Sequence, residues 1–440
     1  MNRGMAMLAA AGTVPLFVDR TVMAMVDPED IKRTQQASGK DGKILVIVQL
    51  SGGNDGLNTV VPYTDDQYYR SRPSLGKPAN QVHKLNDFVG LHPNLTPLKS
   101  LFDAGEMTLL QGVGYPNPNR SHFRSMDIWQ TAIPEEERTS SGWVGRYFDN
   151  TCRGNDPRQA PDATVGVSMG ESAPLAMQGE YVKTLAFEKA ENFRYQGQSV
   201  GNYLKLNQPE EMPDPAATTA TPRPVARPRP GQKIITPATT EGDQIEFLSR
   251  TAMDAQLASD RIRAAVGNHN PKAQYPQGEF GQGLKTVAAM IRGELPTRVY
   301  YVQLGGFDTH ANQQGRHDQL MQQLAQGVGA FWEDLKEQKL AQRVMMMTFS
   351  EFGRRVAQNA SGGTDHGAAA PMFLFGQRLN HSELGAVVGK HPSLTDLDAG
   401  DLKYAIDFRS VYASLLQDWL ETPSKPILGK QFPTAKLVKG

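Results

Sequence analysis

Three short apolar runs, each followed at once by glycine and acidic residues, dominate the hydrophobic pattern of the chain. Ile44–Leu50 leads into Ser-Gly-Gly-Asn-Asp55, Val299–Leu304 into Gly-Gly-Phe-Asp-Thr-His310, and Val344–Phe349 into Ser-Glu-Phe-Gly-Arg-Arg355. Their β-branched, aromatic and aliphatic composition predicts buried strands. Because ligands of open α/β sheets bind beyond the carboxyl ends of strands, the three loops predict one shared polar site.

Segments whose apolar residues have helical spacing lie between these runs. Apolar residues recur every three or four positions from Leu320 to Leu335, which predicts a helix with one core-facing side. Residues 283–349 therefore indicate the order helix–strand–loop–helix–strand, and such a βαβ arrangement implies parallel strands. Further strands are predicted at 107–114, 164–170 and 370–376.

Two polar stretches shape the predicted domain organisation. Residues 1–43 combine a leader-like segment with a linker, and the proline- and arginine-rich stretch near 207–232 cannot form a packed core. Candidate site residues lie on both sides of that stretch. We therefore expect a single α/β domain over 44–440 with a mobile insertion.

The N-terminus resembles an export signal. Met5–Val18 is an apolar run of signal-peptide length that follows Arg3, whereas a twin-arginine signal would need a second arginine where Asn2 stands. We expect a periplasmic or exported protein, with a buried N-terminal helix as the alternative interpretation. No segment beyond this leader is expected to span a membrane.

Composition narrows the function classes. Lys+Arg and Asp+Glu each number 46, so no net field favours nucleic acid, an anionic membrane or an acidic partner. Cys152 is the only cysteine, which excludes an intrachain disulfide and any cysteine-based zinc or iron–sulfur site.

Candidate metal ligands gather at or near the predicted strand ends. A mixed carboxylate and imidazole set suits Zn, Mn or Fe. The candidates are Asp55, Asp308, His310, Glu351, Asp365 and His366. Any single pair among them is more often a loop cap, but their common position favours a metal or phosphoester-type site.

Ser121 is the best candidate nucleophile, since it precedes a predicted helix whose N-terminus favours anions. Adjacent His122 is a poor base for it, so metal activation is preferred, and helix capping is an equally good interpretation. Arg124, like Arg120 and Arg354, is expected to grip an anionic substrate or to pair with a structural carboxylate. Asn54 is expected to polarise a substrate oxygen.

Six motifs in order carry a family resemblance. They are LVIVQLSGGNDGLNTVVP, NRSHFRSMDIWQT, GWVGRYFD, GGFDTHANQ, FSEFGRR and GTDHGAAAP, spread over roughly 44–420. Together they resemble the DUF1501 family of exported, often twin-arginine-targeted bacterial proteins, which looks like a branch of the alkaline phosphatase/sulfatase superfamily. The resemblance implies a doubly wound, mostly parallel sheet flanked by helices, with a metal site at the strand ends.

The resemblance also implies roles for individual residues. Asp55 resembles the metal-bridging acid, Ser121 the nucleophile, Asp308 and His310 two ligands of one metal, and His366 the last histidine ligand. Glu351-Phe352 stands where the superfamily usually has Asp-His, which removes a ligand of the second metal and leaves one or two ions open. The sulfatase Cys/Ser-x-Pro-x-Arg motif is missing from SHFRS, so ordinary sulfatase activity is not expected.

Two functions follow as hypotheses. The first is an exported, metal-dependent hydrolase of phosphate or sulfate esters, in which Ser121 attacks and the substrate is a small anionic ester or a cell-envelope glycan. The second is a non-catalytic exported binding or assembly protein on the same scaffold, which the Phe352 departure favours.

Overall fold

The computed structural model describes residues 42–134, 139–151, 163–193 and 256–439. The predicted leader and the proline-rich stretch 207–232 lie outside these residues.

Strand β1 (Ile44–Ser51) lies inside a nine-stranded sheet, between β8 (Val299–Gly305) and β9 (Val344–Phe349), and runs parallel to both. Val48 of β1 is opposite Val302 on one side and Thr348 on the other. The three strands therefore end at the same edge, and the predicted parallel βαβ arrangement is confirmed. Strands from both sides of residues 194–255 take part in this sheet.

The remaining strands complete the order β11-β5-β10-β9-β1-β8-β6-β7, with β14 paired to β5. All pairs are parallel except those of β10, which is antiparallel to both of its neighbours. The bounds are β5 Met107–Gly114, β6 Gly166–Met169, β7 Leu185–Phe187, β10 Ala370–Phe375, β11 Val387–Val388 and β14 Ile406–Asp407.

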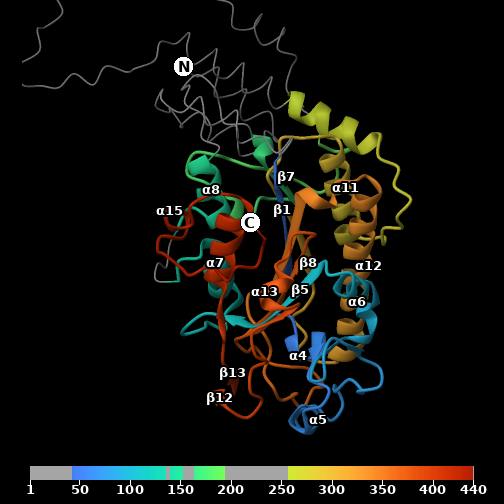
Figure 1. Ribbon diagram of the computed structural model, residues 1–440, viewed down its shortest axis with the longest axis vertical. Coiled ribbons are helices and arrows are strands. Elements are labelled where there is room, and N and C mark those ends of the chain that lie inside the picture. The colour runs from blue at the N-terminus through green and yellow to red at the C-terminus, as the bar shows by residue number, and fades with distance from the viewer. Residues whose placement is uncertain (1–41, 135–138, 152–162, 194–255, 440) are drawn as a thin grey trace, which may run out of the picture.

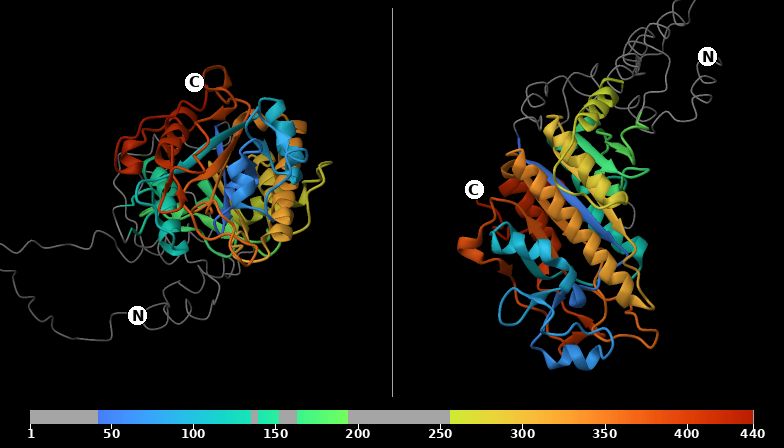
Figure 2. Two further views of the ribbon diagram at one scale, coloured as in Figure 1. Left: turned by 90° about the horizontal axis from the view of Figure 1, so that it is seen from below. Right: turned by 90° about the vertical axis from the view of Figure 1, so that its right-hand side faces the viewer.

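Helices cover both faces of the sheet because β1 is apolar on both. Val46 and Val48 pack into one core, and Leu45 and Ile47 pack into the other. The first core also contains residues of α6 (Thr96–Asp103), α11 (Glu279–Arg292) and α12 (Gln313–Glu337). The second contains residues of α7 (His122–Thr131), α8 (Trp143–Thr151) and α14 (Phe408–Ser414). Figures 1 and 2 show the two layers, which confirm the predicted α/β class of a mostly parallel sheet flanked by helices.

Short elements gather beyond the carboxyl end of β1. They include α4 (Gly56–Thr59), α5 (Asp66–Ser71), the hairpin of β12 (Leu397–Asp398) and β13 (Asp401–Leu402), and a small sheet of β2 (Val60–Val61), β4 (Gly90–Leu91) and β3 (His83–Lys84). In Figure 1 the labels α4, α5, β12 and β13 lie together at the lower end of the molecule. This end is where the sequence places the polar loops.

Among the residues that the structure describes, no helix is long and apolar enough to cross a membrane.

Candidate metal centre

Three histidines and one aspartate converge at the carboxyl ends of β8 and β9. Asp308 and His310 follow β8, His366 lies in the segment between β9 and β10, and His122 is the first residue of α7. We call these four residues the His/Asp cluster. The loops that carry the cluster are close because the parallel strands end together.

Asp308 is the centre of the His/Asp cluster. Its Oδ1 lies 3.0 Å from His310 Nε2 and 3.2 Å from His366 Nε2, and its Oδ2 lies 3.5 Å from His122 Nε2. The two ring nitrogens of His310 and His366 are only 2.9 Å apart. All three imidazoles thus direct the same atom, Nε2, at one carboxylate.

The other ring nitrogen of each histidine faces a hydrogen-bond acceptor. The contacts are His122 Nδ1 to Glu351 Oε1 at 2.9 Å, His310 Nδ1 to Asp365 Oδ1 at 3.1 Å, and His366 Nδ1 to the Arg120 carbonyl at 2.8 Å. A carboxylate or carbonyl has no hydrogen to give, so each Nδ1 must be the donor. In each neutral ring Nε2 then carries a lone pair, and three lone pairs converge on an anion.

Such convergence is unfavourable without a cation between the groups. His122 Nε2 is buried and has no hydrogen-bond partner among the described residues. Three imidazole nitrogens and a carboxylate suit Zn, Mn or Fe, and an acceptor on the far nitrogen of each histidine is the usual outer support of a metal site. His122, Asp308 and His366 offer ligand atoms within 4.8 Å of one another, and His310 Nε2 lies 2.9 Å from that of His366, so the residues present fit a single divalent metal ion.

The carboxyl group of Asp308 is held in its ionised form. Burial opposes ionisation, but the hydrogen bond and the positive charge of Arg354 outweigh it and lower the pKa of Asp308 to about 2. Burial also lowers the pKa of His366, which keeps that ring neutral at pH 7. Both shifts favour the ligand forms that a metal requires.

Arg354 fixes the loops around the cluster. Its guanidinium donates to the carbonyls of Gly53 at 2.7 Å, Thr364 at 2.7 Å and Phe307 at 3.1 Å, and to Asp308 Oδ1 at 2.7 Å. The side chain is fully buried. Sequence analysis offered Arg354 as a substrate-gripping or a structural residue, and its contacts are those of a structural residue.

Gly52 lets the loop after β1 approach the same centre. Its φ is +117°, and a Cβ there would lie 2.4 Å from the backbone nitrogen of Asp308. Its N–H donates to Glu351 Oε1 at 2.8 Å, the atom that also accepts from His122. Glu351, expected as a metal ligand, is buried and instead orients the His122 ring. Asp365 supports His310 in the same way.

Asp55, also expected as a ligand, is occupied elsewhere. Arg72 Nη1 donates to its Oδ2 at 2.5 Å, and both side chains are fully buried. Burial alone would raise the pKa of Asp55, but the charge and hydrogen bond of Arg72 help to lower it. Gln313 also donates to Oδ2 of Asp55, and its own side-chain oxygen accepts from Thr309 and Thr364. Through Gln313, Asp55 therefore supports the loops that carry Asp308 and His366.

The predicted catalytic residues lie in different places. Ser121 is exposed at the N-cap of α7, beside His122, and its side chain makes no capping hydrogen bond. Arg124 donates to the Pro134 carbonyl at 2.8 Å. Asn54 is buried, accepts from Thr59 Oγ1 at 3.0 Å and faces His317. Of these three, Ser121 alone is both exposed and adjacent in sequence to the cluster.

His122 and Arg72 are residues of the candidate site that sequence reasoning missed. His122 was considered only as a base for its neighbour Ser121, although a histidine opening a helix at the site edge is well placed to be a ligand. Arg72 lies in the charged, aromatic segment YTDDQYYRSRPSL, which is typical of a surface or substrate-facing loop, and nothing in it singles out this arginine. Both act through contacts with residues far along the chain.

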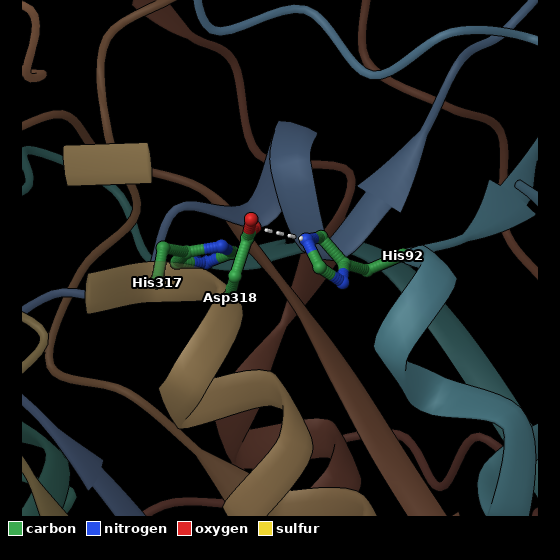
Figure 3. A group of neighbouring side chains, drawn as sticks. All are labelled: His92, His317 and Asp318. Atoms are coloured by element: carbon green, nitrogen blue, oxygen red, sulfur yellow. Dashed lines mark hydrogen bonds and ion pairs between the residues drawn. The ribbon is translucent and has the colours of Figure 1, made fainter. Parts of the chain in front are cut away.

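A second group of ligand-type side chains, His92, His317 and Asp318, has a different character (Figure 3). His92 Nδ1 accepts the Asn94 N–H, so its Nε2 carries the hydrogen that is donated to Asp318 Oδ1 at 2.8 Å. The Lys77 ammonium binds the same oxygen. A lysine thus already holds the position of a cation, and burial lowers the pKa of His317 to about 3. The carboxylate of Asp318 thus links α12 to the segments that carry Lys77 and His92, and the Lys77 ammonium neutralises its charge.

Comparison with known proteins agrees with the sequence motifs. The model of the family described as "Protein of unknown function (DUF1501)" matches residues 237–419. This match confirms the resemblance and includes Asp308, His310 and His366. No curated protein matches the chain.

Three solved structures are similar to the chain at low sequence identity. Lipoteichoic acid synthase LtaP from Listeria monocytogenes is 10% identical, with a TM-score of 0.29 and coverage of 85% of this chain and 72% of that chain. The PsFucS1 sulfatase from Pseudoalteromonas sp. is 10% identical, with a TM-score of 0.38 and coverage of 97% and 76%. The phosphonate monoester hydrolase SpPMH from Silicibacter pomeroyi is 11% identical, with a TM-score of 0.26 and coverage of 89% and 77%. At such low identity and TM-score, the function of this chain has to be argued from its own side chains.

Proposed function

We propose that the protein is a metal-dependent hydrolase of phosphate or sulfate esters that uses one divalent ion held by His122, Asp308, His310 and His366. The observation that carries this proposal is the convergence of three Nε2 atoms on Asp308, with an acceptor behind every ring. A bound divalent ion would polarise an ester oxygen and stabilise developing negative charge.

Ser121 supplies the attacking oxygen in this proposal. Its exposed hydroxyl lies at the start of the ten-residue helix α7, next to the ligand His122. N–H groups in the first turn of a helix have no intrahelical acceptor, so they and the helix dipole favour an anionic ester there. The chain therefore offers a nucleophile and anion-binding groups at one point.

An ester screen tests this proposal. Protein reconstituted with Zn²⁺, Mn²⁺ or Fe²⁺ is assayed on p-nitrophenyl phosphate and p-nitrophenyl sulfate beside Ser121→Ala and the exposed control Ser100→Ala. Loss of a nucleophile costs about 10⁴-fold or more in kcat, whereas the control should match the wild type. Absence of turnover on every ester would contradict the hydrolase, and an active Ser121→Ala would contradict the role of Ser121.

The same site also supports a second function, that of a non-catalytic binding or assembly protein. Phe352 is buried, with its ring centroid 4.9 Å from that of His122 and 4.5 Å from that of His366, and Arg72 holds Asp55. These contacts leave ligands for one ion at the cluster. Glycan binding that requires the metal, without turnover of any ester, would favour this function.

We also propose export, which rests on the apolar run Met5–Val18 after Arg3. Cell fractionation with N-terminal sequencing of the mature protein tests it. A cleaved chain in the periplasm or medium supports export, and an intact chain in the cytoplasm contradicts it.

A further inference from the structure

The C-terminal hairpin contacts Arg120, whose backbone carbonyl supports the His/Asp cluster. The strands β12 and β13 form this hairpin, and Asp401 at the start of β13 is buried, with 3% of its side chain exposed. Arg120 donates from Nε to Asp401 Oδ2 at 2.7 Å. Its Nη2 lies 2.5 Å from the same oxygen. Arg120 therefore grips one buried carboxylate oxygen with two nitrogens.

The backbone of Arg120 has a separate contact. Its carbonyl accepts the Nδ1 hydrogen of His366 at 2.8 Å, the bond that makes His366 present Nε2 to the cluster. The other two histidines are oriented by carboxylates, Glu351 and Asp365. For His366 the orienting group is a carbonyl, whose position depends on how the chain at residue 120 is anchored.

We propose that Asp401 is a positioning residue that sets the metal affinity of the cluster by anchoring Arg120, and with it the carbonyl that orients His366. This inference rests on the proposed metal site. Arg120 precedes α7 and 41% of its side chain is exposed, so without a partner its long side chain is free to move into solvent. Arg355 Nε, 3.5 Å from Asp401 Oδ1, holds the carboxylate from its other side.

The hairpin provides its own matched control. Asp398 is directly opposite Asp401 in the β12–β13 register, but it is exposed. Asp398→Asn and Asp401→Asn remove the same charge from the same hairpin. A general effect of charge or hairpin stability would appear in both variants, whereas anchoring of Arg120 is specific to Asp401.

The test measures metal binding in the full-length protein. Metal-free wild type, Asp401→Asn and Asp398→Asn are titrated with Zn²⁺ in competition with a chromophoric chelator, and with Co²⁺ while the visible ligand-field absorption is recorded. Loss of an outer support typically weakens metal affinity by 10- to 100-fold, so we expect about 10-fold weaker Zn²⁺ binding and an altered Co²⁺ spectrum for Asp401→Asn. Asp398→Asn should bind like the wild type.

A second variant guards against a folding defect in Asp401→Asn. Arg120→Gln removes the anchor from the exposed side and leaves Asp401 paired with Arg355, and it should show a comparable loss of affinity. Wild-type affinity and an unchanged Co²⁺ spectrum in both variants would overturn the role of Asp401 while leaving the metal site intact. A wild type that binds neither ion would instead overturn the proposed site itself.

Discussion

Arg354 is a buried cation that supports the surrounding backbone. Its removal should therefore destabilise the fold more than removal of a surface arginine. Arg354→Met leaves an ion pair with Asp308 broken and several backbone carbonyls without a donor. The Asp308 side chain is 48% exposed, so the loss comes mainly from the unsatisfied buried carbonyls and should be about 1–3 kcal/mol in the free energy of unfolding. Arg355→Met, at the next position with 38% of its side chain exposed, is the matched control and should cost under about 1 kcal/mol. Urea unfolding of both variants measures the difference, and equal losses would contradict this account of Arg354.

Arg316 is an exposed arginine beside the loop that follows β8. Its guanidinium lies against Gly306, two residues before Asp308. The contact is so close that a Cβ built on Gly306 would be only 2.2 Å from Arg316 Nη2. No hydrogen bond or ion pair of Arg316 is found within the described part of the chain, whereas Arg120, Arg124 and Arg354 all have partners.

Removal of Arg316 should therefore weaken substrate binding. For an active wild type, we expect Arg316→Ala to raise KM for an anionic ester about tenfold, which corresponds to about 1.4 kcal/mol, without loss of bound metal. Steady-state kinetics beside Arg261→Ala, an exposed arginine of the helix at 256–267, provides the comparison. An unchanged KM in Arg316→Ala would argue against this role.

At the scale of elements, Asp334 joins α12 to the segment before α11. The buried carboxylate of Asp334 accepts from Tyr275 at 2.8 Å and lies 2.8 Å from His269 Nε2. Burial opposes its ionisation, but the hydrogen bonds from His269 and Tyr275 outweigh burial and lower the pKa of Asp334 below 3.8. Because the folded pKa is the lower one, this stabilisation is present above pH 3.8 and is lost as pH falls through the folded pKa.

The corresponding variant has a defined pH dependence. Asp334→Asn should cost about 1–3 kcal/mol in the free energy of unfolding at pH 7, and the cost should shrink toward zero in strong acid. Exposed Glu333→Gln is the adjacent control and should change stability little at any pH. Urea unfolding from pH 7 down to the acid limit checks the prediction, and a cost independent of pH would contradict it.

At the scale of the whole molecule, hydrophobic patterning predicted the architecture better than the site. Apolar runs such as Ile44–Leu50 predict buried strands by their β-branched and aliphatic composition, and the order of helices and strands implies parallel pairing. The meeting of Asp308, His310 and His366 follows from that topology. The hydrogen-bond and ion-pair partners of each site side chain do not follow from the topology, because they depend on contacts between distant segments.

Particular residues show why the rest of the site escaped prediction. Asp55 follows β1 as a ligand would, but Arg72 returns from α5 and neutralises it. Glu351 follows β9 in the same way, yet its carboxylate meets His122. His122 itself becomes a candidate ligand only when α7 packs beside the ends of β8 and β9. Sequence position thus fixes which side chains reach the edge of the sheet, and long-range packing decides which of them point at a metal.

Metal content tests the central claim most directly. Wild-type protein purified without chelator, and again after reconstitution, is compared by elemental analysis with Asp308→Asn, His122→Ala and His381→Ala, a histidine outside the cluster that pairs with Thr108. We predict about one equivalent of Zn, Mn or Fe in the wild type and in His381→Ala, and loss of that metal from Asp308→Asn and His122→Ala. A wild type that holds no metal even after reconstitution, or variants that retain it fully, would contradict the assignment of the His/Asp cluster as a metal centre.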